Sequence, residues 1–311
     1  MFKNNLYRFA GLVLAVMLLA MTVMPTAVRA AGPWYVATTG DDANSCLSPA
    51  TPCATINGAI GKASSDDTIN VAIGTYTGTG DIFSIVVLIN KNITLLGGWD
   101  ATFTIQSGNS IIDGQNARRA VYINSGVAVT LERFEIQGGN NYLGGGGVTI
   151  DNNSVVAIQN STISGNVAQN GGGISVGINA TLTLNNSTVS GNTAFYSTAG
   201  GIEVYGGSLT VLNSTIVNNT AATNGGGLNV TSSTVSLSNS TVSDNVATSG
   251  GGGGMYNSVS SNLILFNVTF ADNSANSFNG GGMYNEQTSP QITNTTFIGN
   301  SANFGGGMYN N

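Results

Sequence analysis

The sequence predicts an all-β fold, a right-handed parallel β-helix with about 26–28 residues per coil and a short capping helix near its N-terminus. Three observations support this fold. A seven-residue motif recurs through the second half of the chain, apolar and small polar residues alternate beside it, and a glycine cluster closes each unit. The 44 glycines, 8 basic and 14 acidic residues among 311 also favour a repeat architecture over an ordinary globule.

A signal peptide is expected at residues 1–30. A basic stretch precedes an apolar run over residues 9–24, and Val28-Arg29-Ala30 suits cleavage after Ala30. An uncleaved membrane anchor is the alternative, because the run is near the lower length limit for crossing a bilayer. Pro25 and the small residues favour cleavage, so we expect an exported bacterial protein that keeps no transmembrane segment.

Cys46 and Cys53 are the only cysteines and are expected to form a disulfide. Export places them in an oxidising compartment, where the bond would close the short loop between them. A metal site is the alternative, but the sequence contains no histidine to complete one.

The N-terminal part of the solenoid, residues 31–135, is expected to hold a cap and irregular first coils. Residues 54–63 place Ile56, Ala59 and Ile60 on one helical face, which predicts a short amphipathic helix that covers the first coil. Irregular coils follow from Asp67 to about Glu135, and regular coils occupy residues 136–311.

The regular coils are marked by a motif that begins and ends with Asn. Successive copies start 26, 27, 26, 28 and 27 residues apart. Residues 181–185 alternate apolar and small polar side chains, as expected for a strand with one buried face. Six copies at one spacing therefore predict coils stacked by parallel strand pairing, about 4.8 Å apart. The copies are residues 160–166, 186–192, 213–219, 239–245, 267–273 and 294–300.

The sixth position of the motif predicts a tight turn in every coil. It holds only Gly, Asn or Asp, the residues that tolerate a left-handed backbone. The asparagines at the first and seventh positions are expected to form amide ladders between coils. Some copies also read as glycosylation sequons, but asparagine engaged in a ladder is poorly available for modification.

Two resemblances to known families cover nearly the whole expected mature chain. The segments 270–273 and 297–300, each followed by Gly-Gly-Gly-Met, resemble the polymorphic outer membrane protein repeat. The region from Trp34 through Cys53 to Gly74-Thr-Tyr-Thr resembles the start of bacterial pectin-lyase-like β-helix proteins. The resemblances imply the fold and a secreted or surface setting. They imply no single activity, because this fold hosts enzymes and adhesins alike.

Catalytic chemistry has few candidate residues, and no catalytic, cofactor or metal-binding residue is assigned. A lyase needs a base beside acids that hold calcium, and a hydrolase needs paired carboxylates. The one mixed cluster is interpreted as solvated charges. Asp244 and Asp272 could share a calcium ion, although a turn alone explains them. The mixed cluster consists of Lys91, Asp100, Asp113, Arg118, Arg119, Glu132 and Arg133.

Two outward-facing columns are candidate binding surfaces. Alternation places the third motif residue, always threonine, outward in every coil. It also predicts an exposed stack of Tyr256, Tyr284 and Tyr309, which suits sugar rings or a protein partner. The alternative is that the tyrosines only stabilise one another.

The expected function is a noncatalytic secreted or cell-surface scaffold, adhesin-like, that binds glycans or protein partners. The alternatives are a polysaccharide lyase or hydrolase working around Arg118, Arg119 and Arg133, and an ice-binding protein using the threonine column. Nucleic acid is excluded as a partner, because no basic residue follows Arg133. The charge-free C-terminal coil predicts either a truncated chain or end-to-end self-association.

Overall fold

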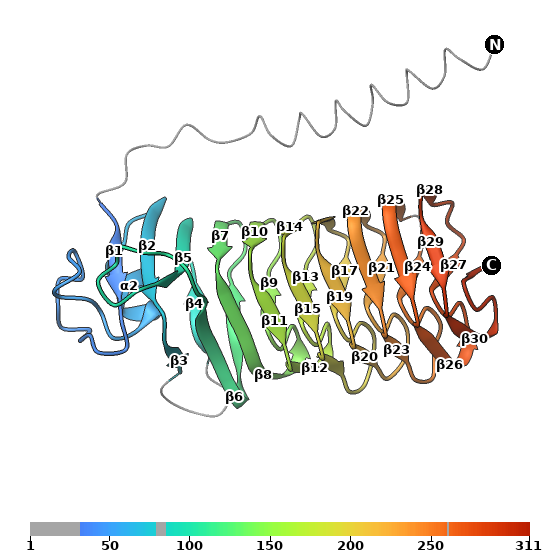
Figure 1. Cartoon of the computed structure of the whole chain (residues 1–311), viewed down its shortest axis with the longest axis horizontal. Coiled ribbons are helices and arrows are strands. Elements are labelled where there is room, and N and C mark those ends of the chain that lie inside the picture. The colour runs from blue at the N-terminus through green and yellow to red at the C-terminus, as the bar shows by residue number, and fades with distance from the viewer. Residues whose placement is uncertain (1–31, 79–84, 260) are drawn as a thin grey trace, which may run out of the picture. The chain divides into compact units, whose positions relative to one another are not determined.

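The computed structural model describes residues 32–78, 85–259 and 261–311, so the expected signal peptide lies outside the described residues. The described chain is a β-solenoid of about nine turns with about 27 residues per turn, and Figure 1 shows its coils side by side. All strand pairings between coils are parallel. The fold prediction is confirmed.

Each regular coil has strands on three faces, called A, C and B in chain order. Face A bends in the middle, and its first half contains β1 (Trp34–Val36), β2 (Asp67–Ala72), β5 (Ile93–Trp99), β7 (Ala128–Glu132), β10 (Val155–Gln159), β14 (Thr181–Asn185), β18 (Ser208–Leu212) and β28 (Gln291–Thr293). Its second half contains β3 (Thr75–Thr77), β11 (Thr162–Ser164), β15 (Thr188–Ser190), β19 (Thr215–Val217) and β29 (Thr296–Ile298). The strands β22 (Thr234–Ser243) and β25 (Asn262–Ala271) span both halves.

Faces C and B complete the coil. Face C contains β12 (Val167–Asn170), β16 (Thr193–Ala194), β20 (Thr220–Ala221), β23 (Val246–Ala247), β26 (Ser274–Asn279) and β30 (Ser301–Phe304). Face B contains β4 (Ile85–Ile89), β9 (Val148–Ile150), β13 (Ile174–Val176), β17 (Ile202–Tyr205), β21 (Leu228–Thr231), β24 (Met255–Ser258), β27 (Met283–Glu286) and β31 (Met308–Asn310). Two early strands are long: β6 (Ser110–Ile123) runs from face A to face B, and β8 (Phe134–Gly144) runs from face A onto face C.

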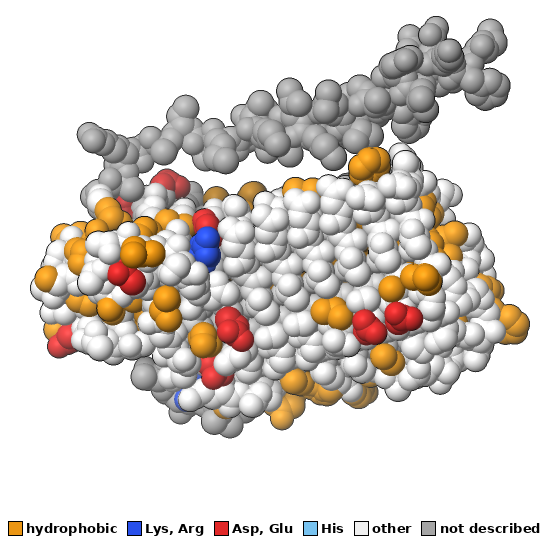
Figure 2. Space-filling model, viewed as in Figure 1, with side chains coloured by type: hydrophobic (Ala, Val, Ile, Leu, Met, Phe, Trp, Pro, Cys, Tyr) orange, Lys and Arg blue, Asp and Glu red, His pale blue; other side chains and the backbone are white. Residues whose placement is uncertain are grey.

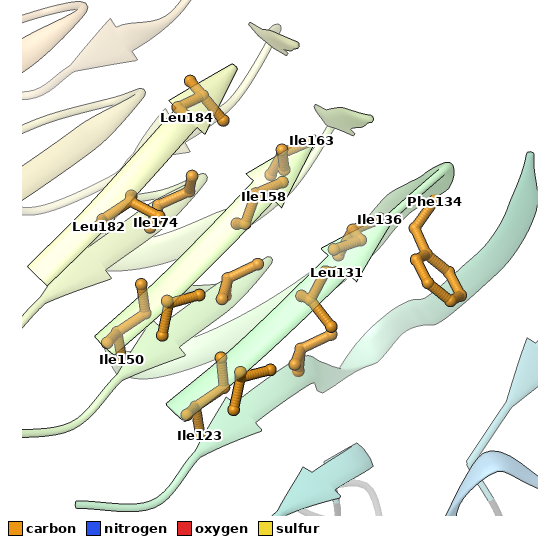
Figure 3. Close-up of a cluster of buried hydrophobic side chains, with 14 of the residues drawn as sticks. Ile123, Leu131, Phe134, Ile136, Ile150, Ile158, Ile163, Ile174, Leu182 and Leu184 are labelled. Carbon is orange, nitrogen blue, oxygen red and sulfur yellow. The ribbon is translucent and has the colours of Figure 1, made fainter. Parts of the chain in front are cut away.

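The core is built from columns of like side chains, one from each coil. Ile136, Ile163 and Val189 are fully buried and stand in register through the pairing of β8, β11 and β15. Figure 3 shows such aliphatic side chains gathered in the interior, with Leu131 beside Ile136 and Ile158 beside Ile163. The period-two alternation in the sequence therefore gives the correct inward register.

A buried asparagine ladder lies at the turn between faces A and C. The Nδ2 of Asn192 donates to the Oδ1 of Asn219, at 3.0 Å, and to the carbonyl oxygen of Ile163, also at 3.0 Å. The backbone N–H of Asn192 donates to the same Oδ1. Buried amides need such partners, so the ladder predicted for the seventh position is confirmed. It contains Asn166, Asn192, Asn219, Asn245, Asn273 and Asn300.

The ladder predicted for the first position is confirmed only in the last coils, where Asn267 and Asn294 each donate to the asparagine of the preceding coil. A third ladder, which the sequence interpretation missed, runs inside face B. Asn257 Nδ2 donates to Asn285 Oδ1 at 3.2 Å, and Asn285 Nδ2 donates to Asn310 Oδ1 at 2.8 Å. These amides extend the inward column that valines occupy in the earlier coils.

Turns with left-handed backbone recur where they were predicted. Every sixth motif position has positive φ, from 53° at Asp272 to 64° at Gly299. In the glycine clusters, Gly225 has φ +67°, and a Cβ on Gly226 would lie 2.4 Å from the carbonyl oxygen of Gly253 in the next coil. Glycine is required there because adjacent coils approach backbone to backbone.

The predicted capping helix is α2 (Ile56–Lys62), slightly shorter than the expected 54–63. The hydroxyl of Thr55 accepts from the N–H of Gly58 and caps it, while Ile56, Ala59 and Ile60 are buried. The helix packs against β1, β2 and β4. No helix among the described residues is long and apolar enough to cross a membrane. The Cys46–Cys53 disulfide is present, with both residues fully buried.

Candidate functional site: a groove beside β6 and β8

A groove of about 490 Å³ lies beside the parts of β6 and β8 that have left face A. It is formed by the second half of β6, the end of β8 and the start of β4. Arg119 is the one charged residue among the described residues that line it. The lining residues are Ile85, Asn116, Ala117, Arg119, Asn140, Asn141, Tyr142 and Leu143.

Arg119 is held by an aromatic ring rather than by an ion pair. Its guanidinium carbon lies 4.7 Å from the centroid of the Tyr122 ring, and the Tyr122 hydroxyl donates to Asp151 Oδ2 at 2.9 Å. Among the described residues, Arg119 has no ion pair, and its buried Nε has no acceptor. Burial lowers the pKa of the guanidinium from its ordinary value, while Tyr122 and Asp151 act in the opposite direction. Arginine nevertheless stays charged at neutral pH.

The amide side chains of the groove are fixed by the backbone around them. Asn140 Nδ2 donates to the carbonyl oxygen of Asn116 at 3.0 Å, and Asn141 Nδ2 donates to that of Gly144 at 2.6 Å. Asn141 Oδ1 accepts from the N–H of Leu143. Asn140 Oδ1 accepts no hydrogen bond from any described residue, so this oxygen remains available to a ligand.

An exposed aromatic cluster adjoins the groove. Tyr142, which lines the groove, is 70% exposed, and its ring meets the Phe195 ring edge to face at 6.2 Å. Tyr196, next to Phe195, is 71% exposed. The rings of Tyr142 and Phe195 thus form an exposed apolar surface beside the groove.

The tyrosine stack predicted on face B is present, but its predicted exposure is partly wrong. The ring centroids of Tyr256 and Tyr284 lie 5.0 Å apart, and those of Tyr284 and Tyr309 lie 5.2 Å apart. Tyr284 is only 5% exposed, and Phe278 of β26 lies against its ring with the centroids 5.8 Å apart. The rings therefore mainly contact one another, and the middle one offers little surface to a ligand.

The hydroxyl of Tyr256 is also engaged. It donates to Glu286 Oε2 at 2.6 Å, and burial together with this hydrogen bond raises the pKa of Tyr256 well above its ordinary value. The stack is therefore a weaker candidate ligand face than the groove.

The mixed charged cluster named from the sequence is divided among separate local contacts. Lys91 donates to the carbonyl oxygens of Ile60 and Ala63 at the end of α2, and Glu132 pairs with Arg133 at 3.9 Å. Asp100 accepts bonds from its own loop, and the hydrogen bond from Thr102 is the main cause that lowers the pKa of Asp100 to about 2.

The remaining members of the cluster lie on β6. Asp113 accepts from the N–H of Gln115, Arg118 donates to the Gln115 side chain, and only Arg119 reaches the groove.

Asp244 and Asp272 occupy left-handed turns, with φ of 54° and 53°. The turn conformation accounts for both residues. Within the described part of the chain, no group of three or more His, Cys, Asp or Glu side chains could hold a metal ion.

The threonine column on face A stands in register across six coils, from Thr162 to Thr296. Its side chains are half-buried, except for Thr296 in the last coil, which is exposed. Figure 2 shows that the middle coils carry few charged side chains on the visible side of the molecule. Ice binding through this column stays a prediction.

The sequence interpretation named Arg119 but missed the rest of the groove. The available signal was an irregularity: residues 140–143 precede their glycine cluster and include the pair Tyr142-Leu143, where the next coil has only Gln169 between the paired positions. Insertions of this kind in a solenoid often lie on the binding face.

Residues 86–241, half of the chain, match the right-handed β-helix region family, so the chain belongs to this family. The architecture of the described coils agrees with that assignment.

Among solved structures, the chain is similar to the pectate lyase Pel9A, at 15% identity and a TM-score of 0.54, over 86% of this chain and 71% of that one. A rhamnogalacturonan lyase matches with a TM-score of 0.38 at 13% identity, over 86% of this chain and 84% of that one. At 15% identity the likeness to the pectate lyase shows the fold alone. A comparison with curated proteins gives no match. No match to polymorphic outer membrane protein repeats is found, so that finer resemblance stays a prediction.

Proposed function

We propose that this protein is an exported, noncatalytic β-helix scaffold, adhesin-like in its surface setting, that binds acidic glycans through the groove around Arg119. One observation carries the proposal: Arg119 lies in a groove, stacked on Tyr122, without an anionic partner among the described residues. Export rests on the expected signal peptide at residues 1–30, and the surface setting on the resemblance of segments 270–273 and 297–300 to outer membrane protein repeats.

The groove has the chemistry that a uronic acid requires. A planar guanidinium can donate two parallel hydrogen bonds to a carboxylate, and the ring beneath Arg119 holds it in place. The Asn140 Oδ1 can accept from a sugar hydroxyl. The exposed Tyr142 ring offers an apolar surface to the C–H face of a pyranose.

The noncatalytic character of the proposal rests on the acids around the groove. Hydrolysis of a glycosidic bond uses two carboxyl groups that flank it, and no carboxylate is among the described lining residues. The nearby Asp151 is already engaged by the Tyr122 hydroxyl.

A polysaccharide lyase is the second candidate, and one observation favours it. Burial lowers the pKa of Arg119, which is the direction that raises the fraction of neutral guanidine able to accept a proton. The fold shared with a pectate lyase is compatible with this activity but does not establish it.

Calorimetric titration with oligogalacturonides tests the proposal. The wild-type protein is expected to bind them, to bind neutral oligosaccharides of equal length more weakly, and to release no unsaturated uronides. Arg119→Gln should weaken binding about tenfold or more, the equivalent of roughly 1.4 kcal/mol.

Arg133→Gln is the matched control, because it removes one positive charge outside the groove and should leave affinity unchanged. Equal losses in both variants would point to unspecific charge attraction and overturn the site. Release of unsaturated uronides by the wild-type protein, abolished in Arg119→Gln, would establish the lyase instead.

A further inference from the structure

We propose that the glycan path extends from the groove along the solenoid axis onto the aromatic cluster of Tyr142, Phe195 and Tyr196, so that the site binds a chain of several sugars. This inference rests on the proposed function and adds a second subsite to it. The rest of the described surface offers no comparable candidate, since the tyrosine stack is covered at Tyr284 and the small cleft beside α2 has no charged residue among its lining.

The groove and the aromatic cluster are continuous, because Tyr142 belongs to both. Tyr142 lines the groove and also meets the Phe195 ring at 6.2 Å with an interplanar angle of 83°. The register shows the spacing of the loops: β8 pairs with β12, and β12 pairs with β16, so one coil separates Tyr142 from Phe195. Between Arg119 on β6 and Phe195 there are three coil steps, or about 14 Å along the axis.

Phe195 and Tyr196 lie on a loop whose backbone is hydrogen-bonded to the preceding coil. The N–H of Phe195 donates to the Ala168 carbonyl oxygen at 3.0 Å, and that of Ser197 donates to the Gln169 carbonyl oxygen at 3.1 Å. The Thr198 hydroxyl donates to Glu203 Oε1 at 2.8 Å. The cluster is therefore a preformed platform, and a ligand that docks on it does not have to order the loop.

The character of the surface changes along this path. The Arg119 end offers a positive charge, whereas the cluster offers aromatic rings. Tyr142 is 70% exposed, Phe195 45% and Tyr196 71%. Aromatic rings contact the apolar face of a sugar whether or not it carries a carboxylate. The groove should therefore require an acidic unit, and the cluster should accept neutral or esterified units of the same chain.

Titration with oligogalacturonides of increasing length tests this extension. The wild-type affinity should rise with length by about tenfold in total and then level off. Tyr196→Ala should remove this rise while leaving the affinity for the shortest binding oligomer unchanged. Tyr205→Ala is the matched control, because Tyr205 is a 56% exposed tyrosine of face B that lies outside the path.

The outcomes separate the two proposals. If no oligomer binds, the proposed function fails. If short oligomers bind, depend on Arg119 and show no gain with length, or if Tyr196→Ala keeps the gain, the function stands and the extension fails. Light scattering on the same samples tests whether a second copy of this chain occupies the cluster. If Tyr196→Ala turns a wild-type dimer into a monomer, the cluster binds a second copy and the extension is overturned.

Discussion

Single residues with buried polar groups define the interior of this solenoid as much as its aliphatic columns do. Each seventh-position asparagine satisfies its own donors and accepts from the coil before it, so the ladder fixes the stacking register coil by coil. Glu203 is different, because it is a carboxyl group mostly withdrawn from water. It accepts bonds from Thr198 and Asn170 and has no cationic partner among the described residues.

Glu203 should make stability depend on pH. Burial raises the pKa of Glu203, so the folded state holds this proton more tightly than the unfolded chain does. The stabilisation from this tighter proton binding is complete below the pKa of Glu203 in the unfolded chain. It is lost as the pH rises through the pKa of Glu203 in the folded state. Glu203→Gln keeps an acceptor for Thr198 without the charge. Its melting temperature should therefore be a few degrees above that of the wild type at neutral pH and equal to it near pH 4. Thermal unfolding across this pH range measures the difference. Parallel curves of melting temperature against pH for the two proteins would contradict the prediction.

At the scale of the strand, one register decides which residues face the core. Val189 is fully buried between Ile163 and Ile216, while its neighbour Thr188 points outward in the threonine column. Adjacent positions of a three-residue strand therefore have opposite environments. Because the strands pair in parallel and in register, the same positions face inward in the neighbouring coils.

Val189→Asp should destabilise the protein by several kcal/mol, because it buries an unpaired charge in an apolar column. Thr188→Asp, its matched control, introduces the same side chain on the outer face and should cost far less. Urea unfolding of both variants gives the comparison. Equal losses of stability would show that the inward and outward register is wrong.

At the scale of the whole molecule, the strands of each described coil pair only with those of adjacent coils, so the solenoid is a one-dimensional stack with a helix packed against its early coils. The disulfide restrains the loop that precedes α2. The stacked coils present long faces with few charged side chains. The groove lies where the irregular early coils differ from the regular ones.

Intact-mass measurement of exported material should show a chain that begins at Ala31 and contains no free thiol. The expected cleavage follows from the export signal, and the thiols are consumed in the Cys46–Cys53 bond. Alkylation before reduction should add no mass, and alkylation after denaturing reduction should label both cysteines. A retained 1–30 segment would instead support the membrane anchor.

The sequence by itself determined the coil length, the left-handed turns, the inward columns and the disulfide. These features repeat, or lie within a few residues of one another, so periodicity and local backbone preference are enough to predict them. Glycine, asparagine or aspartate at the sixth motif position, for example, identifies the same turn in every coil.

The tertiary structure alone decided the groove, the burial of Tyr284 and the asparagine ladder inside face B. The groove and the burial of Tyr284 depend on how irregular segments of different coils lie against one another: Tyr142 meets Phe195 across an intervening coil, and Phe278 covers Tyr284. The ladder depends on three asparagines that face inward on the paired strands β24, β27 and β31. A repeat pattern specifies where each strand runs, but it carries no information on how irregular loops fold over their neighbours. The candidate site lies at these irregularities, because that is where the coils stop being alike.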